Sequence, residues 1–240
     1  FDVVPYIPDR YSEGYGLSEE GIRSASAMGC GLIITLDCGI RAVDRVCDAN
    51  ERGIDVIVCD HHLPGAVMPD AHTILNPKQP NCPYPFKELS GCGVAFKMIQ
   101  ALTERIGLSP WSAYDSLDLV ALSIASDLVE VTGENRILLH HGLKTVSRNS
   151  RPGIRALLQI VHCTPDYLTV RDIISRISPR INAAGRMSRA TEAVDLLTAR
   201  NEQRAAELAM NLDRLNNIRR SYDEHVTAAA IQQRAKRPQV

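Results

Sequence analysis

Two short apolar runs, each ending in an aspartate, constrain the fold of this chain more than any other feature. Residues 32–37 and 54–60 are continuous enough to be strands covered on both faces. Between them, residues 41–52 show helical spacing and stop at Gly53, and an earlier helix is opened by Ser18-Glu19-Glu20. With residues 1–7 as an opening strand, the order is strand, helix, strand, helix, strand. This alternation predicts an α/β fold, a parallel sheet with right-handed crossovers and helices on both faces.

The rest of the chain is expected to be largely helical. Residues 71–90 indicate a loop around a short strand at 73–75, and helical patterns follow from Gly93 onward. No glycine occurs after Gly185, which predicts one long helix near the end of the chain. Its apolar positions form a narrow stripe: Leu208, Leu212, Leu215, Tyr222, Val226 and Ala229.

Composition excludes several classes of protein. The chain has 240 residues, 45% of them hydrophobic, and 27 Lys and Arg balance 28 Asp and Glu to a net charge of −1. This is a globular composition, and no apolar run approaches the ~20 residues needed to span a membrane. Seven cysteines without a C-x-x-C pair predict reduced thiols in a cytoplasmic protein and argue against structural zinc. Because the chain starts at Phe1, we expect it to be a piece of a longer protein.

The strongest chemical signal lies where the two predicted strands end. Asp37 follows the first strand, and Asp60, His61 and His62 follow the second. Ligands bind at the carboxyl edge of parallel sheets, so these side chains are expected to converge there. Carboxylates with imidazole favour Mn²⁺ or Mg²⁺. The alternative interpretation is that both aspartates cap the following helices.

Other polar residues give weaker signals. Asp127 closes an apolar segment, where it is either a metal ligand or a helix-end residue. His140 and His141 follow an apolar run without nearby acids, so we interpret them as surface or helix-packing residues.

Two segments are candidates for phosphate contacts. Ser90 and Gly91 precede a helix whose first amides could receive a phosphate, although a simple glycine turn is at least as good an interpretation. The basic segment 171–190 is predicted to contain a loop bounded by proline and glycine. Its Arg180, Asn182 and Arg186 suit phosphate binding, and the alternative is a solvated basic loop.

Taken together, these segments resemble the DHH phosphoesterase family, and within it the branch of exonucleases specific for single-stranded DNA. The matching motifs occur in the same order as in the family and extend over most of the chain. They are Tyr6-Ile7-Pro8-Asp9-Arg10, Glu13-Gly14-Tyr15-Gly16-Leu17, Thr35-Leu36-Asp37-Cys38-Gly39, Asp60-His61-His62, Ser90-Gly91-Cys92-Gly93-Val94-Ala95-Phe96-Lys97, Ala125-Ser126-Asp127-Leu128-Val129 and Ser178-Pro179-Arg180-Ile181-Asn182-Ala183-Ala184-Gly185-Arg186-Met187.

The resemblance implies a role for each candidate. Asp37 would bridge two Mn²⁺ or Mg²⁺ ions, His61 and Asp127 would bind one of them, and His62 would contact the scissile phosphate. Asp60 would be a ligand or would orient the histidines. The nucleic-acid path would be lined by Ser90, Gly91, Arg180, Asn182 and Arg186. Two cations can activate water and stabilise the leaving oxygen of a phosphodiester.

The resemblance also implies an organisation and a function. Residues 1–187 would be a DHH domain without its first Asp-x-Asp motif, and residues 188–240 a helical connector toward a further domain. The function would be 5′-to-3′ digestion of single-stranded DNA in repair and recombination. Alternatives are another DHH phosphodiesterase acting on oligoribonucleotides or cyclic dinucleotides, and a non-catalytic nucleic-acid-binding relative. We expect this piece alone to bind at most one Mn²⁺ tightly and to lack exonuclease activity.

Overall fold

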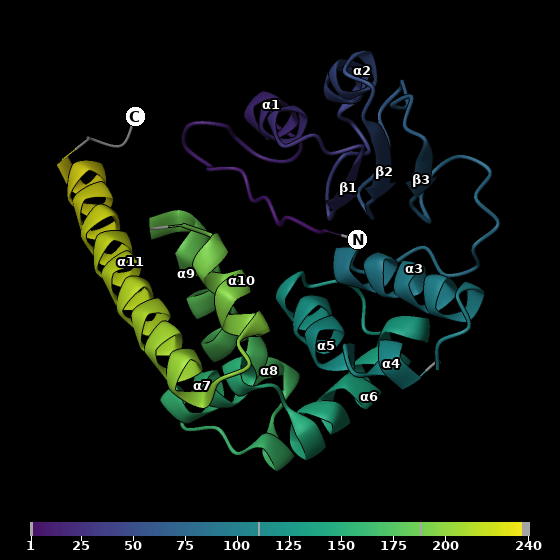
Figure 1. Cartoon of the computed structure of the whole chain (residues 1–240). Coiled ribbons are helices and arrows are strands. Elements are labelled where there is room, and N and C mark those ends of the chain that lie inside the picture. Colours follow the sequence, from purple (N-terminus) through teal and green to yellow (C-terminus); the bar gives the residue numbers. More distant parts are fainter. Residues whose placement is uncertain (1, 110, 188, 237–240) are drawn as a thin grey trace. The chain divides into compact units, whose positions relative to one another are not determined.

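The computed structural model describes residues 2–109, 111–187 and 189–236, which pack into two units (Figure 1). Unit 1 consists of Phe1–Ser150 and Pro165–Ile173, and unit 2 of Arg151–Thr164 and Ile174–Val240. This division differs from the boundary expected at residue 187. The reason is that helices before that residue pack against the long terminal helix and belong with it.

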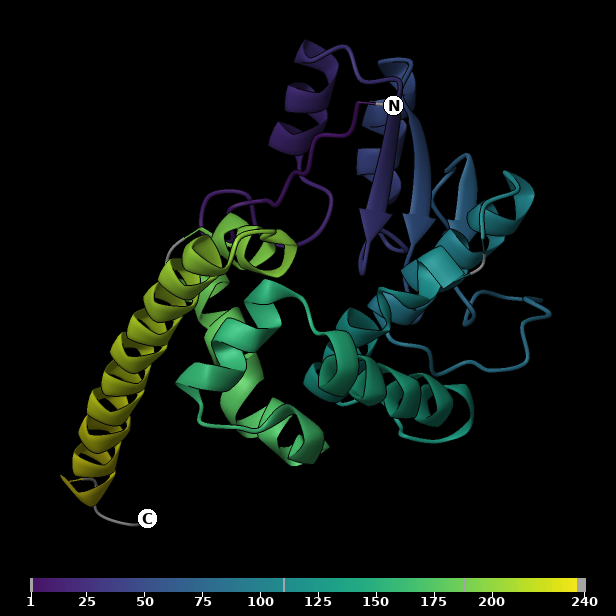
Figure 2. The ribbon, with the colours of Figure 1, turned by 60° about the horizontal axis from the view of Figure 1, so that its bottom comes forward.

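Unit 1 contains the predicted parallel sheet. Its strands β1 (Leu32–Leu36), β2 (Asp55–Cys59) and β3 (Thr73–Leu75) lie in the order β1-β2-β3 (Figure 2). Their last residues are in register, because Leu36 pairs with Cys59 and Cys59 pairs with Leu75. The three residues that follow the strands therefore start from one edge of the sheet.

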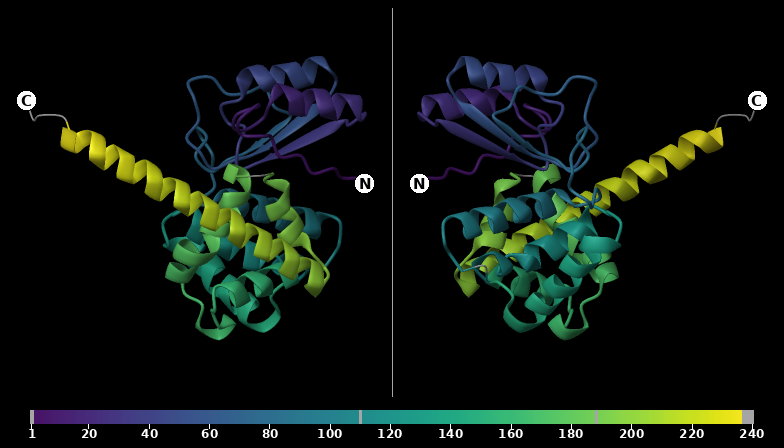
Figure 3. Two further views of the ribbon diagram at one scale, coloured as in Figure 1. Left: turned by 90° about the vertical axis from the view of Figure 1, so that its left-hand side faces the viewer. Right: turned by 90° about the vertical axis from the view of Figure 1, so that its right-hand side faces the viewer.

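Helices cover the two faces of the sheet, as predicted. The helices α1 (Glu19–Ala27) and α2 (Val43–Glu51) share an apolar cluster with Val56 and Val58 (Figure 3). On the other face, Cys59 packs with α3, α5 and α6. These helices span Gly91–Arg105, Leu117–Ser126 and Gly133–Asn149, and the short elements of the unit are α4 (Trp111–Tyr114), η1 (Pro165–Tyr167) and α8 (Val170–Asp172).

Two expectations about strands are wrong. Residues 2–7 form no strand, because Pro5 has no N–H to donate to a ladder and Val3 is 83% exposed; Phe1 lies outside the described residues. Nor is β1 buried on both faces. It is an edge strand of the described sheet, and Ile34 and Leu36 are 43% and 55% exposed.

Unit 2 is helical, and part of it corrects the predicted basic loop. A π-helix, η2 (Ile173–Ile177), runs directly into α9 (Ser178–Met187), so Arg180, Asn182 and Arg186 lie on a helix. Pro179 directly follows the π-helix, inside a helical run that continues from Val170 to Met187. The other helices are α7 (Pro152–Ile160), α10 (Thr191–Thr198) and α11 (Glu202–Lys236).

The long helix α11 is confirmed, but its apolar stripe has two environments. Leu208, Leu212 and Leu215 are buried against α7, α9 and α10, whereas Tyr222 and Val226 are 62% and 67% exposed. Among the described helices, none is long and apolar enough to cross a membrane.

The contact between α5 and α6 depends on a glycine and gives a test of the packing. A Cβ at Gly142 would lie 2.2 Å from the carbonyl oxygen of Leu117 and 2.6 Å from Cβ of Ala121. Gly142→Ala should therefore lower the free energy of unfolding by about 1–3 kcal/mol. Gly31→Ala is the matched control, since a Cβ there meets nothing within 4 Å. Urea denaturation measures both, and equal stabilities of the two variants would contradict this packing.

Candidate metal centre

The turn after β1 places Asp37 at the edge of the sheet. Asp37 has a φ of +62°, a left-handed conformation that aspartate tolerates better than most residues. Gly39 follows at φ +107°, and a Cβ there would lie 2.7 Å from Oγ1 of Thr35. That hydroxyl donates a hydrogen bond to the carbonyl of Cys38 at 2.8 Å. The backbone conformation of this turn thus explains the aspartate and the glycine of the Asp-Cys-Gly motif.

Asp60 is a buried carboxylate surrounded by donors. It accepts hydrogen bonds from the amides of Ile40 (3.0 Å), His61 (2.8 Å) and His62 (3.2 Å), and from Nδ1 of His62 (2.7 Å). Burial acts to raise the pKa of Asp60, but the bonds from Ile40, His62 and His61 outweigh it and lower the pKa. Of the two roles expected for Asp60, this geometry suits the orientation of its histidine neighbours.

His61 occupies the centre of the site. Its ring is buried, and Nε2 lies 3.1 Å from Oδ1 of Asp37 and 3.1 Å from Oδ2 of Asp127. Despite these distances, neither ring nitrogen has a partner in hydrogen-bond geometry among the described residues. Two ligands held at about 2.1 Å from one cation, at right angles, are about 3.0 Å apart. Asp37 and Asp127 therefore each lie at the distance from His61 Nε2 that two ligands of one divalent cation would have.

Protons compete with a metal ion for these nitrogen and oxygen atoms. The Asp37 carboxylate raises the pKa of His61; burial of the ring opposes this shift and Asp127 adds to it. Burial raises the pKa of Asp127, although His61 acts in the opposite direction. Because metal ligands must be deprotonated, a bound cation replaces a proton here.

His62 is presented differently from His61. Its side chain is 57% exposed, and its ring meets the His61 ring edge-on with centroids 4.6 Å apart. The bond from Nδ1 to Asp60 fixes the ring and leaves Nε2 as the nitrogen for an external group. Asp37, His61 and His62 each offer a ligand atom within 4.8 Å of the others.

Asp127 combines the two alternatives left open by the sequence. It is the C-cap residue of α5, where its amide donates to the carbonyl of Ser123 at 2.9 Å. Its side chain is 37% exposed and reaches His61. The helix end therefore carries the carboxylate to the site.

Ser90 and Gly91 are buried beside Asp37 at the start of α3, and their expected contact with a nucleic acid stays a prediction. The Ser90 hydroxyl caps α3 by accepting from the Gly93 amide at 3.1 Å, and it also accepts from the Ser123 hydroxyl at 3.0 Å. A Cβ on Gly91 would lie 2.2 Å from Oδ1 and 2.7 Å from Cβ of Asp37. The glycine leaves room for the carboxylate above the start of α3.

One supporting residue, Asn76, is missed by the sequence argument. It directly follows β3 and is 2% exposed. Its side-chain amide donates to the carbonyl of His62 at 2.9 Å, and its Oδ1 accepts from the Lys78 amide at 2.8 Å. The available signal was its position, since a polar residue follows each of the three strands.

The basic residues on α9 belong to unit 2. Arg180 is held by Asp213 through Nε and Nη2, both at 2.7 Å, and its side chain is 18% exposed, so it fastens α9 to α11. Asn182 and Arg186 are exposed. Their expected place along a nucleic-acid path stays a prediction. His140 and His141 are exposed on α6.

Comparisons with known proteins show the family of the chain. Residues 1–124 match the model of the DHH family, N-terminal domain. The chain is 42% identical over 227 residues to the single-stranded-DNA-specific exonuclease RecJ of Bacillus subtilis, which covers 95% of this chain and 28% of that protein. RecJ of Salmonella typhimurium is 40% identical over 241 residues, covering 96% of this chain and 42% of that protein.

Solved structures give the same result. A crystal structure of exonuclease RecJ bound to manganese matches with a TM-score of 0.86 and 35% identity, over 97% of this chain and 58% of that chain. RecJ from Thermus thermophilus in complex with Mn²⁺ matches with a TM-score of 0.79 and 32% identity, over 89% and 32%. The chain spans less than half the length of the curated relatives it matches.

The closeness of Gly91 to Asp37 predicts a selective loss of metal binding. Gly91→Ala must displace the whole Asp37 side chain, so Mn²⁺ affinity should fall about 10- to 100-fold, as for other changes beside metal ligands. Gly93→Ala is the control, because its Cβ would come no closer than 3.3 Å to its neighbours. Calorimetric titration with Mn²⁺ decides the matter, and an unchanged affinity in Gly91→Ala would contradict the assignment.

Proposed function

This chain belongs to the DHH family, and on that premise we propose that the protein hydrolyses phosphodiester bonds of single-stranded DNA from the 5′ end, using Mn²⁺ or Mg²⁺. The observation that carries the proposal is the position of His61 Nε2, 3.1 Å from the carboxylates of both Asp37 and Asp127 without a hydrogen bond to either. The names of the relatives, exonucleases specific for single-stranded DNA, support the substrate.

Each residue of the centre has its own task. His61, Asp37 and Asp127 would hold a cation, and Asp37 would be the carboxylate shared with a second one. Bound cations would activate a water and stabilise the leaving oxygen. Asp60 keeps His62 in one orientation through Nδ1, which leaves Nε2 facing an external group; with Nδ1–H donating to Asp60, Nε2 donates a hydrogen bond to a phosphate oxygen only as the imidazolium. Asn76 holds the His62 backbone in place.

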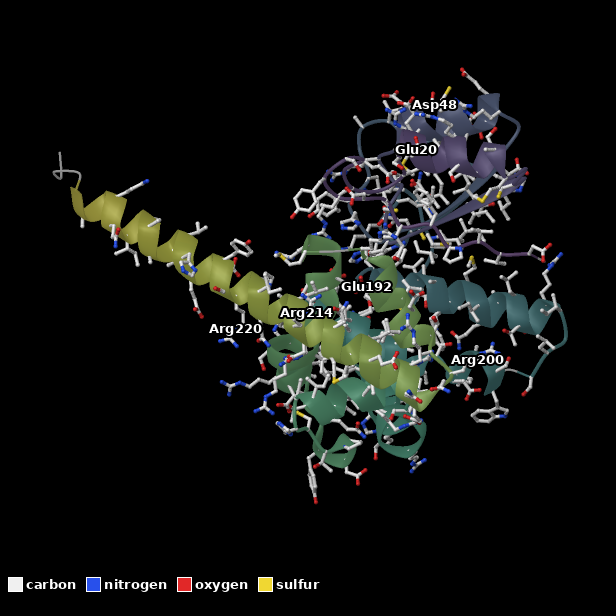
Figure 4. All side chains as sticks on the ribbon, turned by 60° about the vertical axis from the view of Figure 1, so that its left-hand side comes forward. Glu20, Asp48, Glu192, Arg200, Arg214 and Arg220 are labelled. Atoms are coloured by element: carbon white, nitrogen blue, oxygen red, sulfur yellow. The ribbon has the colours of Figure 1, made fainter. Side chains whose placement is uncertain are left out.

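Charge distribution supports a polyanionic substrate. The net charge of −1 hides two opposite parts: unit 2 has 14 Lys and Arg against 7 Asp and Glu, a charge of +7, and unit 1 has 13 against 21, a charge of −8. Figure 4 shows Glu20 and Asp48 on unit 1, and Arg214 and Arg220 on α11. A basic body supplies the phosphate contacts that dominate affinity for nucleic acids. Arg186 and Asn182 are exposed on this body and are proposed as contacts.

The cellular setting follows from the chemistry. All seven cysteines are free thiols, which supports a reducing compartment such as the cytoplasm. An enzyme that removes single strands from the 5′ end suits DNA repair and recombination.

A chimera tests the function. The aligned 227-residue segment of Bacillus subtilis RecJ is replaced by the corresponding part of this chain. The chimera should digest a labelled single strand from its 5′ end in the presence of Mn²⁺ and leave duplex DNA intact. His61→Ala should lower this rate at least about 100-fold, because it removes a metal ligand. His72→Ala, which is 64% exposed on its side chain, is the control.

Metal binding by the 240-residue chain is a second test that does not depend on whether the chimera folds. Calorimetry should detect Mn²⁺ binding that His61→Ala abolishes and His72→Ala preserves. Absence of Mn²⁺ binding in a folded wild-type chain, or equal digestion by the His61→Ala chimera, contradicts the proposal.

A further inference from the structure

The exposed face of α6 is free of acidic residues, which is unexpected in unit 1 with its charge of −8. Only one acid occurs in the helix, Glu134, and it is engaged by the hydroxyl of Tyr84 at 2.6 Å and by Lys97. The exposed side chains of α6 beyond it are Arg136, Ile137, His140, His141, Lys144 and Arg148.

Four of these residues form a regular row. Arg136, His140, Lys144 and Arg148 recur every four positions, so successive members are about 6 Å apart along the axis and the row is about 18 Å long. Like charges at this spacing, such as Lys144 and Arg148, repel one another within a helix. None of the ion pairs among the described residues involves Arg136, Lys144 or Arg148. Within the described part of the protein, no direct ion pair therefore neutralises these three cations.

An exposed aromatic ring lies near the end of this row. The 3₁₀ helix η1 packs on α6, and Asp166 accepts a hydrogen bond from the hydroxyl of Ser147, the residue before Arg148. The next residue of η1, Tyr167, is 81% exposed.

We propose that the row on α6, together with Tyr167, is a second binding surface for single-stranded nucleic acid, separate from the metal centre. Cations that follow a backbone and an aromatic ring that stacks on an unpaired base are the two parts of such surfaces. An acidic peptide would use the row but has no use for Tyr167, and a duplex offers no free base. The inference rests on the proposed function only in that both involve single-stranded nucleic acid, because binding to this surface needs no metal.

Binding without metal tests this surface. Fluorescence anisotropy of a labelled oligothymidylate with the 240-residue chain, in EDTA over a series of salt concentrations, gives the affinity and its salt slope. The double variant Lys144→Gln and Arg148→Gln should make the slope shallower by about 1.4, since each lost phosphate contact on a single strand removes about 0.7. Tyr167→Ala should weaken binding about fivefold or more without changing the slope, and Tyr167→Phe should restore it.

Two controls separate this surface from bulk charge and from the metal site. Arg52→Gln with Arg105→Gln makes the same change in net charge on other exposed positions of unit 1 and should leave the slope unchanged. His61→Ala should bind in EDTA like the wild type, so loss of the exonuclease proposal would not remove this one. Equal salt slopes for the two double variants, or wild-type affinity of Tyr167→Ala, would overturn the inference. If an acidic peptide displaces the oligothymidylate equally well from the wild type and from Tyr167→Ala, the row is assigned to a protein partner instead.

Discussion

A buried imidazole facing two carboxylates is the constraint around which unit 1 is arranged. Burying His61 with neither nitrogen hydrogen-bonded is costly unless another group completes the cluster. The surroundings hold that geometry from several directions: parallel strands end in register, Asp60 ties the histidine turn to Ile40, Gly91 admits Asp37, and α5 ends at Asp127. A divalent cation bound here would satisfy the nitrogen together with neighbouring carboxylate oxygens.

Much of this arrangement was predictable, because the spacing of apolar residues and the acids at strand ends can be read from short stretches of sequence. The parallel order of β1 and β2, the convergence of Asp37 with His61 and the long helix α11 follow from them. The predictions that failed concern features that depend on contacts with other parts of the chain. Residues 2–7 look extended but lack a partner strand in the described part of the chain. The loop predicted around Arg180 is a helix, because α9 continues the π-helix η2 through Pro179. The sequence alone also does not reveal that Gly91 leaves room for the Asp37 side chain, because the two residues are far apart in the chain.

Separation of charge explains how one chain can serve two incompatible needs. A metal centre requires carboxylates, which repel a phosphate backbone, and backbone binding requires cations, which weaken a metal site. Unit 1 carries the acids and unit 2 the excess of arginine, so the net charge of −1 describes neither. The cationic row on α6 is the exception within the acidic unit and marks a surface with its own partner.

Anomalous diffraction from crystals grown with Mn²⁺ tests the central claim most directly. A manganese peak is expected within about 2.0–2.6 Å of His61 Nε2 and of carboxylate oxygens from both Asp37 and Asp127. A cluster without a peak at saturating Mn²⁺, in which His61 Nε2 forms a direct hydrogen bond to one of the aspartates, would contradict the assignment of a metal site.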